Sequence, residues 1–157
     1  PLEEQNRALW NRPAIAEGCA LALQALSQRG FGVYALQAAI AALHGEAASA
    51  EATDWPQIVG LYDALLRLEP SPVIALNRAV AVAMRDGPEA GLALVEALLP
   101  ALPGYHPAPA AAADLCRRAG RLGEAQTYYR AAAESAASAR QEPERRYLLR
   151  RLAEVGG

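Results

Sequence analysis

Proline and glycine divide this chain at short intervals, and this punctuation constrains its fold more than any other feature. They cluster at residues 70–72, 87–88 and 100–104, and the segments between the clusters are rich in alanine and leucine. Alanine has the highest helix propensity, whereas proline and glycine begin or end helices. Runs of β-branched residues are scarce, and aromatic residues make up only 6% of the sequence. We therefore predict an all-α chain of about eight helices joined by short turns.

The stretch "PSPVIALNRAVAVAMRDGPEAG" shows how these breaks divide the chain. Pro70 and Pro72 separate two helices, because the residue before a proline disfavours the α conformation. Gly87 then ends the second of these helices, and Pro88 begins the following one. Each of the resulting segments has the length of a single helix.

A repeat lies within this pattern. The segments "GPEAGLALVEAL" and "RLGEAQTYYRAA" align at an offset of 35 residues, close to the period of about 34 residues that is typical of tetratricopeptide repeats. This alignment superposes small and large residues in the pairs Glu89/Glu124, Ala90/Ala125, Leu94/Tyr129 and Ala97/Ala132. A further step back of the same length gives a weaker match at Trp55, Val59 and Tyr62.

We therefore predict antiparallel helix pairs that stack as a tetratricopeptide-like right-handed solenoid, because each pair alone would expose an apolar face. The pairs are expected near 33–68, 72–99 and 107–138. Capping helices are expected near 13–29 and 142–155, and the chain 1–157 is expected to form a single domain.

Asn77 and Arg78 are neighbouring polar residues on the first helix of the middle pair. They allow two interpretations, which the spacing alone does not separate. Either they contact a ligand in a groove, or they are structural. In the structural interpretation, which we favour, Asn77 satisfies a buried turn and Arg78 pairs with a carboxylate such as Asp63 or Glu46.

The charge balance gives no sign of nucleic-acid binding. The net charge is -2, and all 15 basic residues are arginines. No polybasic patch for DNA or for an anionic membrane is present. The densest basic stretch, "ERRYLLRRL", contains Arg145, Arg146, Arg150 and Arg151, and we predict that they form the solvated face of an amphipathic helix.

No catalytic motif is found. The sequence lacks a phosphate-binding loop, a dinucleotide fingerprint and a nucleophile elbow. His44 and Glu46 are two residues apart, so they point to different faces of a helix, and His106 lies far along the chain. We expect no enzyme activity, no metal and no cofactor. For Tyr128 and Tyr129, we predict one packing residue beside a half-exposed one.

The remaining features concern the cellular compartment. Cys19 and Cys116 lie on apolar helical stretches, which is typical of reduced core residues, although a disulfide between them stays open. No signal peptide is visible, and no apolar run reaches the ~18 residues of a membrane span. We expect a cytoplasmic protein. The first residue is Pro1 rather than methionine, which we interpret as processing or excision from a longer chain.

Several strings resemble one bacterial family. They are "LWNRPAIAEGCALA", "DLCRRAGRLGEAQTYYRAAAE" and, most specifically, "TDWPQIVGLYDALL" and "PSPVIALNRAVAV". Together they resemble the C-terminal extension of a group of extracytoplasmic-function (ECF) RNA polymerase sigma factors, over nearly the whole chain. The family pattern carries a histidine and an arginine in the region written here "PAPAAAADLCRRAGR", where this sequence has alanines.

The resemblance implies a regulatory role. In that group a helical, tetratricopeptide-like domain follows the two promoter-reading sigma domains, which we expect to lie outside this chain. The extension would contact the sigma domains of the same polypeptide or core RNA polymerase and tune transcription initiation, without binding nucleic acid itself. Asp54, Trp55, Asn77 and Arg78 match the family strings and are our candidate interaction surface.

A second hypothesis is a small-molecule sensor domain that switches the sigma factor. A closed pocket with a convergent polar cluster around Arg78 would favour the sensor. An open groove with exposed apolar residues would favour a protein partner. An enzyme ranks third, because no constellation of residues supports one.

Overall fold

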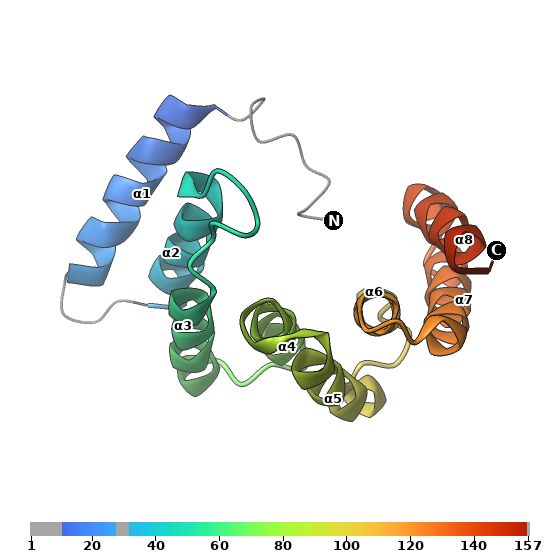
Figure 1. Cartoon of the computed structure of the whole chain (residues 1–157). Coiled ribbons are helices and arrows are strands. Elements are labelled where there is room, and N and C mark those ends of the chain that lie inside the picture. Colours follow the sequence, from blue (N-terminus) through green and yellow to red (C-terminus); the bar gives the residue numbers. More distant parts are fainter. Residues whose placement is uncertain (1–10, 28–31, 157) are drawn as a thin grey trace. The chain divides into compact units, whose positions relative to one another are not determined.

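A computed structural model describes residues 11–27 and 32–156 of the chain. Within these residues it contains eight α-helices, one short 3₁₀ helix and no strand (Figure 1), which confirms the all-α prediction. The elements are α1 (Arg12–Ser27), α2 (Val33–Glu46), α3 (Trp55–Leu68), α4 (Pro72–Asp86), α5 (Pro88–Leu98), η3 (Leu99–Ala101), α6 (Pro107–Arg118), α7 (Leu122–Ser138) and α8 (Glu142–Gly156). None of the described helices is both long and apolar enough to cross a membrane.

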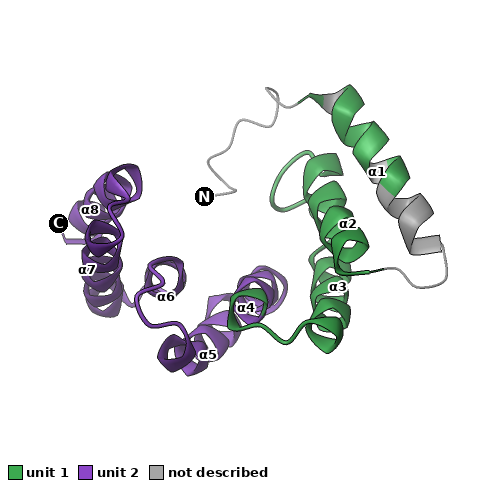
Figure 2. Cartoon of the chain, turned by 180° about the vertical axis from the view of Figure 1, so that it is seen from behind, with its two compact units in different colours: residues 1–74 green, residues 75–157 purple. Residues whose placement is uncertain are grey.

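The chain divides into two compact units, residues 1–74 and residues 75–157 (Figure 2). The boundary falls near the start of α4, after Ile74. The expectation of a single domain stays a prediction.

The predicted breaks coincide with the observed helix ends. Asp54 caps α3, because its Oδ1 accepts a hydrogen bond from the backbone N–H of Gln57 at 3.0 Å. Such a cap satisfies one of the free amides of the first turn. Gly87 separates α4 from α5 and has φ = 105°, a backbone conformation that residues other than glycine rarely adopt. Pro88 follows as the first residue of α5, where its missing N–H costs no helical hydrogen bond.

In the first unit, α1 packs on α2, and α2 packs on α3. Leu36 and Ile40 of α2 and Ile58 and Leu65 of α3 are buried. Their spacing of four or seven residues places each pair on one helix face, so the apolar stripes of the two helices face a shared core. The predicted end of the first helix at Gly30 lies outside the described residues.

In the second unit, each helix from α5 to α8 packs on the next one along the chain. Figure 1 shows α7 and α8 lying side by side. The interior is dominated by fully buried alanines, namely Ala108, Ala112, Ala113, Ala125, Ala132 and Ala136. Small side chains let helix backbones approach closely, because little volume separates the axes. The alanine content thus determines the tight packing of this unit.

The structure corrects the predicted repeat register from 35 to 34 residues. Gly91 and Val95 are buried on α5, and Ala125 and Tyr129 are buried on α7 at an offset of 34. Ala79 and Val82 of α4 correspond in the same way to Ala113 and Cys116 of α6, and all four are buried. By contrast, Ala90 and Leu94, which the 35-residue alignment used, are exposed. The register of 34 matches the tetratricopeptide period, while the right-handed solenoid stays a prediction.

Candidate functional site

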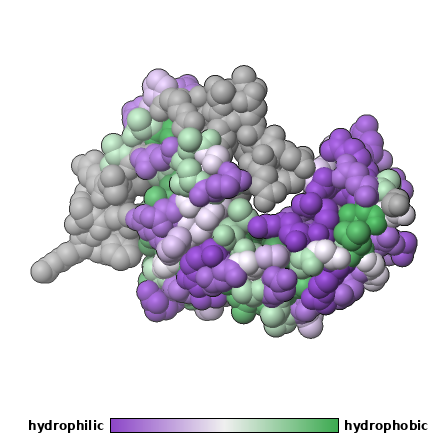
Figure 3. Space-filling model, in the orientation of Figure 1, coloured by the Kyte–Doolittle hydropathy of each residue, from purple (hydrophilic) through white to green (hydrophobic). Residues whose placement is uncertain are grey.

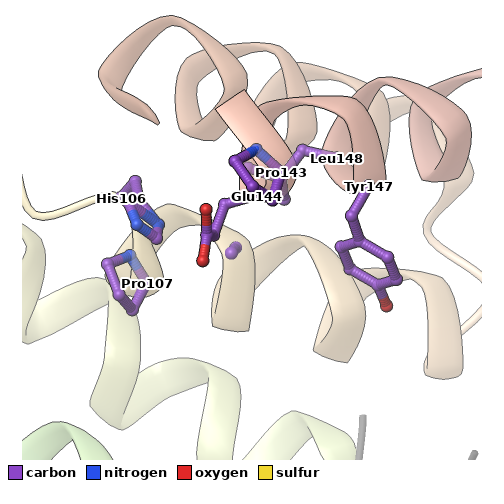
Figure 4. A pocket seen from close by; sticks show the side chains of 7 residues that line it. His106, Pro107, Pro143, Glu144, Tyr147 and Leu148 are labelled. Carbon is purple, nitrogen blue, oxygen red and sulfur yellow. The ribbon is translucent and has the colours of Figure 1, made fainter. Parts of the chain in front are cut away.

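A pocket lies between α6 and α8 in the second unit (Figure 4). Its volume is about 400 Å³, and it is open to solvent on one side. The lining is mostly apolar and consists of His106, Pro107 and Ala110 from the α6 segment and Pro143, Glu144, Tyr147 and Leu148 from α8. A pocket of this size and lining is typical of a binding site for a side chain or a small molecule.

Helical spacing explains why these residues meet. Pro107 and Ala110 are three residues apart on α6, and Pro143 and Tyr147 are four residues apart on α8, so each pair lies on one helix face. Prolines occupy the first turns of both helices, where they are tolerated. Ala110 is small, so α6 does not fill the space that faces Tyr147. Figure 4 shows the Tyr147 ring at the end of the pocket farther from His106.

A hydrogen bond links the two chain segments that lead into α6 and α8. The imidazole Nε2 of His106 bonds to Oε1 of Gln141, and because an amide oxygen only accepts, Nε2–H is the donor. This bond fixes the starts of the two helices relative to each other. Figure 4 shows the Glu144 side chain pointing from α8 toward His106 and Pro107.

Arginines stand beside the pocket. The guanidinium carbon of Arg150 lies 5.4 Å from the centroid of the Tyr147 ring, within the range of a cation–π contact. Arg146 is exposed on the preceding turn of α8. Both arginines lie on the solvated face that the sequence predicts. Figure 3 shows hydrophilic residues gathered around a hydrophobic patch on the side where Figure 1 labels α7 and α8.

One helical turn beyond the pocket, an ion pair between Asp114 and Arg151 joins α6 and α8. Asp114 accepts from Nη2 of Arg117 at 2.8 Å and lies 3.8 Å from Nη2 of Arg151. Arg151 also donates to Glu154 at 2.6 Å. Burial lowers the pKa of Arg117, but the hydrogen bond and charge of Asp114 outweigh it, so the pKa is raised overall. Arg117 therefore binds within α6, and Arg151 is the arginine that holds α8 against α6.

The position of Arg151 corrects one expectation. It was predicted on the solvated face of the last helix, but its side chain is only 12% exposed. The reason is that Asp114 of α6 supplies a counter-charge, which makes burial of the guanidinium tolerable.

The paired tyrosines confirm the predicted arrangement. Tyr129 is buried, with 2% of its surface exposed, whereas Tyr128 is half-buried and donates its hydroxyl to Oε1 of Glu96 at 3.0 Å. Burial, reinforced by the nearby Glu96 carboxylate, raises the pKa of Tyr128 to about 12. Neither ring forms an exposed stacking platform.

Two of the predicted site residues, Asp54 and Trp55, belong to the first unit. Asp54 is exposed but has the structural role of capping α3. Trp55 is buried, with only 6% exposed, and its indole Nε1 donates to the carbonyl of Ala50 at 2.8 Å. Its ring also meets the His44 ring edge-on, at a centroid distance of 5.3 Å. The structure thus places the Trp55 side chain in the core rather than on a surface. There its hydrogen bond to Ala50 stabilises the loop before α3.

The other two, Asn77 and Arg78, lie on α4 in the second unit. Asn77 is exposed, so the interpretation that it satisfies a buried turn does not hold. Arg78 is half-buried, and its pairing with Asp63 or Glu46 stays a prediction. The pair Asp54–Trp55 and the pair Asn77–Arg78 therefore fall in different units, and neither lines the pocket.

The described residues contain no group of three or more histidine, cysteine or acidic side chains that could hold a metal ion. Cys116 is a free, buried cysteine, as predicted for a core residue. Burial raises the pKa of its thiol. The side chain of Cys19 lies outside the described residues.

The pocket was not predicted from the sequence. The available signal was the pair of prolines at the starts of α6 and α8, Pro107 and Pro143, each followed by residues at helical spacing. It was missed because the two segments are 36 residues apart and only packing through α7 brings them together.

Comparison with known proteins gives one informative match. An uncharacterized protein of Rhizobium meliloti (strain 1021) is 51% identical over 128 residues, which are 82% of this chain and 30% of the relative. The chain therefore spans less than a third of that relative, whose length is about 430 residues, since 128 divided by 0.30 gives that value. No family model matches the chain. No solved structure matches it.

Proposed function

We propose that this chain is a non-enzymatic interaction and regulatory domain of a bacterial ECF sigma factor. In this proposal it acts in the cytoplasm, contacts the sigma domains of the same polypeptide or core RNA polymerase, and modulates transcription initiation. The observation that carries the proposal is the open pocket between α6 and α8, with an apolar lining and arginines beside it. Protein interfaces combine an apolar centre with a polar rim in the same way.

The repeat supports this proposal. Helix pairs at an offset of 34 residues are the building units of tetratricopeptide arrays, which use extended surfaces to bind other proteins. The family strings around α3 and α4 point to the sigma-factor group in particular.

The length of the relative is a second support. If this chain corresponds to about 30% of a protein of about 430 residues, roughly 300 residues remain for other parts. Two further domains of ordinary size fit within that length. This is the arrangement expected for two sigma domains joined to an extension.

The proposal includes no catalysis. Among the residues that line the pocket, Glu144 is the one carboxylate, and the Nε2 of His106 is engaged by Gln141. General acid–base catalysis needs positioned groups that can exchange a proton with a substrate, and in this proposal Glu144 and His106 act in binding and in joining the two helix starts instead.

A small-molecule sensor remains the alternative, and the pocket volume favours it, since about 400 Å³ falls in the range of small-ligand sites. Two observations favour a protein partner instead. The pocket is open to solvent, and Arg78, around which the sensor hypothesis expects a polar cluster, does not line it.

Isothermal titration calorimetry tests the proposal. The chain is titrated with a two-domain sigma fragment and then with core RNA polymerase. We expect binding at micromolar affinity or tighter, with Arg78→Ala weakening it and Arg130→Ala, an exposed arginine on α7, leaving it unchanged. No heat with either partner would contradict the proposal and favour the sensor, for which a metabolite screen by thermal shift would follow.

A further inference from the structure

We propose that the pocket between α6 and α8 binds an acidic segment of a partner protein, with one bulky apolar side chain in the pocket and acidic side chains on Arg146 and Arg150. The inference rests on the proposed function, because it names the face and the partner chemistry through which the regulatory domain would act.

The lining suits an apolar side chain. Leu148 and Ala110 form part of the wall, with the Tyr147 ring and the rings of Pro107 and Pro143 around them. These groups offer little hydrogen bonding to a polar ligand. An inserted leucine or phenylalanine would remove apolar surface from water on both partners, which is favourable in proportion to the area. The open side leaves room for the backbone that carries such a side chain.

The charge beside the pocket is positive, although the whole chain has a net charge of -2. Helices α6 and α8 together carry six arginines and four carboxylates. Three of the carboxylates already bind arginines, in the pairs Arg117–Asp114, Arg145–Glu142 and Arg151–Glu154. Arg146 and Arg150 are exposed on α8 and bind no carboxylate within these two helices. Complementary charge would steer an acidic partner to this face.

The two features are arranged in order along α8. Glu144 lines the pocket and would repel an acidic side chain there, which favours an apolar one. Arg146 and Arg150 are four residues apart, so they lie on neighbouring turns. Acidic side chains four residues apart on a partner helix have the same spacing. Arg150, which rests on the Tyr147 ring at 5.4 Å, connects the charged side to the pocket.

Fluorescence anisotropy with three labelled peptides tests the inference on the whole chain. The first peptide is helical and contains glutamates four residues apart and one phenylalanine. The second has alanine in place of the phenylalanine, and the third has lysine in place of every glutamate. We expect the first peptide to bind and the third not to bind. The second should bind at least about tenfold more weakly than the first, as for loss of an interface anchor. Equal binding of the first two would overturn the inference, since the pocket would then contribute nothing.

Variants of the chain test the same contacts. Ala110→Phe fills the pocket, and Arg146→Glu with Arg150→Glu reverses the charge; each should weaken the first peptide about tenfold or more. Arg130→Glu on α7 is the matched surface control and should leave binding unchanged. The double charge variant alters only exposed side chains, so it keeps the test valid if Ala110→Phe fails to fold. Binding of the double variant equal to that of the original chain would overturn the inference.

A last comparison separates this inference from the proposed function. If the chain binds the sigma fragment or polymerase and Ala110→Phe, shown to be folded by circular dichroism, binds equally well, the pocket inference is overturned while the proposed function stands. If the acidic peptide binds but neither large partner does, the pocket inference stands while the proposed function falls.

Discussion

A single hydrogen atom in place of a side chain determines how closely α4 and α5 pack. A Cβ added at Gly91 would collide with the Cβ of Ala83, and it would lie 2.9 Å from the Cα of Ala83 and 2.7 Å from the carbonyl oxygen of Ala79. Two of these atoms belong to the backbone, so they cannot move without shifting the helix. We expect Gly91→Ala to lower the free energy of unfolding by up to about 2 kcal/mol, because overpacking of about 1–3 kcal/mol outweighs a helix-propensity gain of about 1 kcal/mol. Urea denaturation measures the change.

Gly60→Ala is the matched control for this substitution. Gly60 lies inside α3, and no heavy atom would be within 4 Å of its added Cβ. Only the propensity term then acts, so this variant should gain about 0.5–1 kcal/mol. If both variants gained stability, the close approach of α4 and α5 would be refuted.

Tyr128 provides a prediction about alkaline pH. Its pKa is raised to about 12 in the folded protein, against about 10 in an unfolded chain. Folding therefore favours the protonated phenol, so its contribution to stability is complete below pH of about 10 and is lost as the pH rises toward 12. We expect Tyr128→Phe to make the decline of the urea midpoint between pH 10 and 12 shallower. Tyr34→Phe, at a side chain that is 86% exposed, should leave the decline unchanged, and equal profiles for the two variants would disprove the assignment.

At the scale of the helix, Asp54 shows how a matched family string can have a structural cause. Its carboxylate accepts from the N–H of Gln57 at 3.0 Å and caps α3. Asp54→Ala should lower the unfolding free energy by about 1 kcal/mol, while Asp54→Asn, which keeps an oxygen acceptor, should cost only a few tenths. Thermal unfolding measures both. If the two variants had equal stability and both lost partner binding in calorimetry, the carboxylate would act at an interface rather than as a cap.

The helices themselves could be predicted from sequence because local residue types determine where they begin and end, as at Asp54, Gly87 and Pro88. The repeat register could not, because it depends on which face a neighbouring helix covers. Ala90 and Gly91 are both small, and the sequence does not tell that only Gly91 lies against α4. A shift of one residue in an alanine-rich helix changes the period from 34 to 35 and leaves the pattern equally good.

The candidate site was harder to predict for the same reason. Trp55 looked like a surface residue because it stands in a distinctive string, yet its indole N–H satisfies the carbonyl of Ala50 inside the core. Arg151 looked solvated because charge usually is, yet Asp114 of another helix lets it be buried. The pocket depends on Pro107 and Tyr147, which are far apart along the chain and on helices that do not follow each other.

For the whole molecule, the pattern of contacts predicts local rather than global responses to damage. The helix pairs that share the most contacts, such as α1 with α2 and α7 with α8, are sequence neighbours. In repeat proteins, stability is a sum of terms for units and for their nearest neighbours, so each unit should open with its own free energy. Ile58 is fully buried in the first unit and Leu115 is 2% exposed in the second. Truncating either to alanine should cost about 2–5 kcal/mol.

Hydrogen exchange followed by mass spectrometry measures which helices lose stability in these two variants. Ile58→Ala should accelerate amide exchange in α2 and α3 more than in α6, α7 and α8, and Leu115→Ala should do the reverse. The two substitutions control for each other, because each removes a large aliphatic side chain from the core of one unit. Uniform acceleration along the chain with either variant would mean that residues 1–74 and 75–157 unfold as one cooperative body, and the repeat-like behaviour would be refuted. The expected opposite patterns would mean that the two units open separately. A partner bound on α8 would then stabilise chiefly the second unit, so regulation through this face would be restricted to the helices around it.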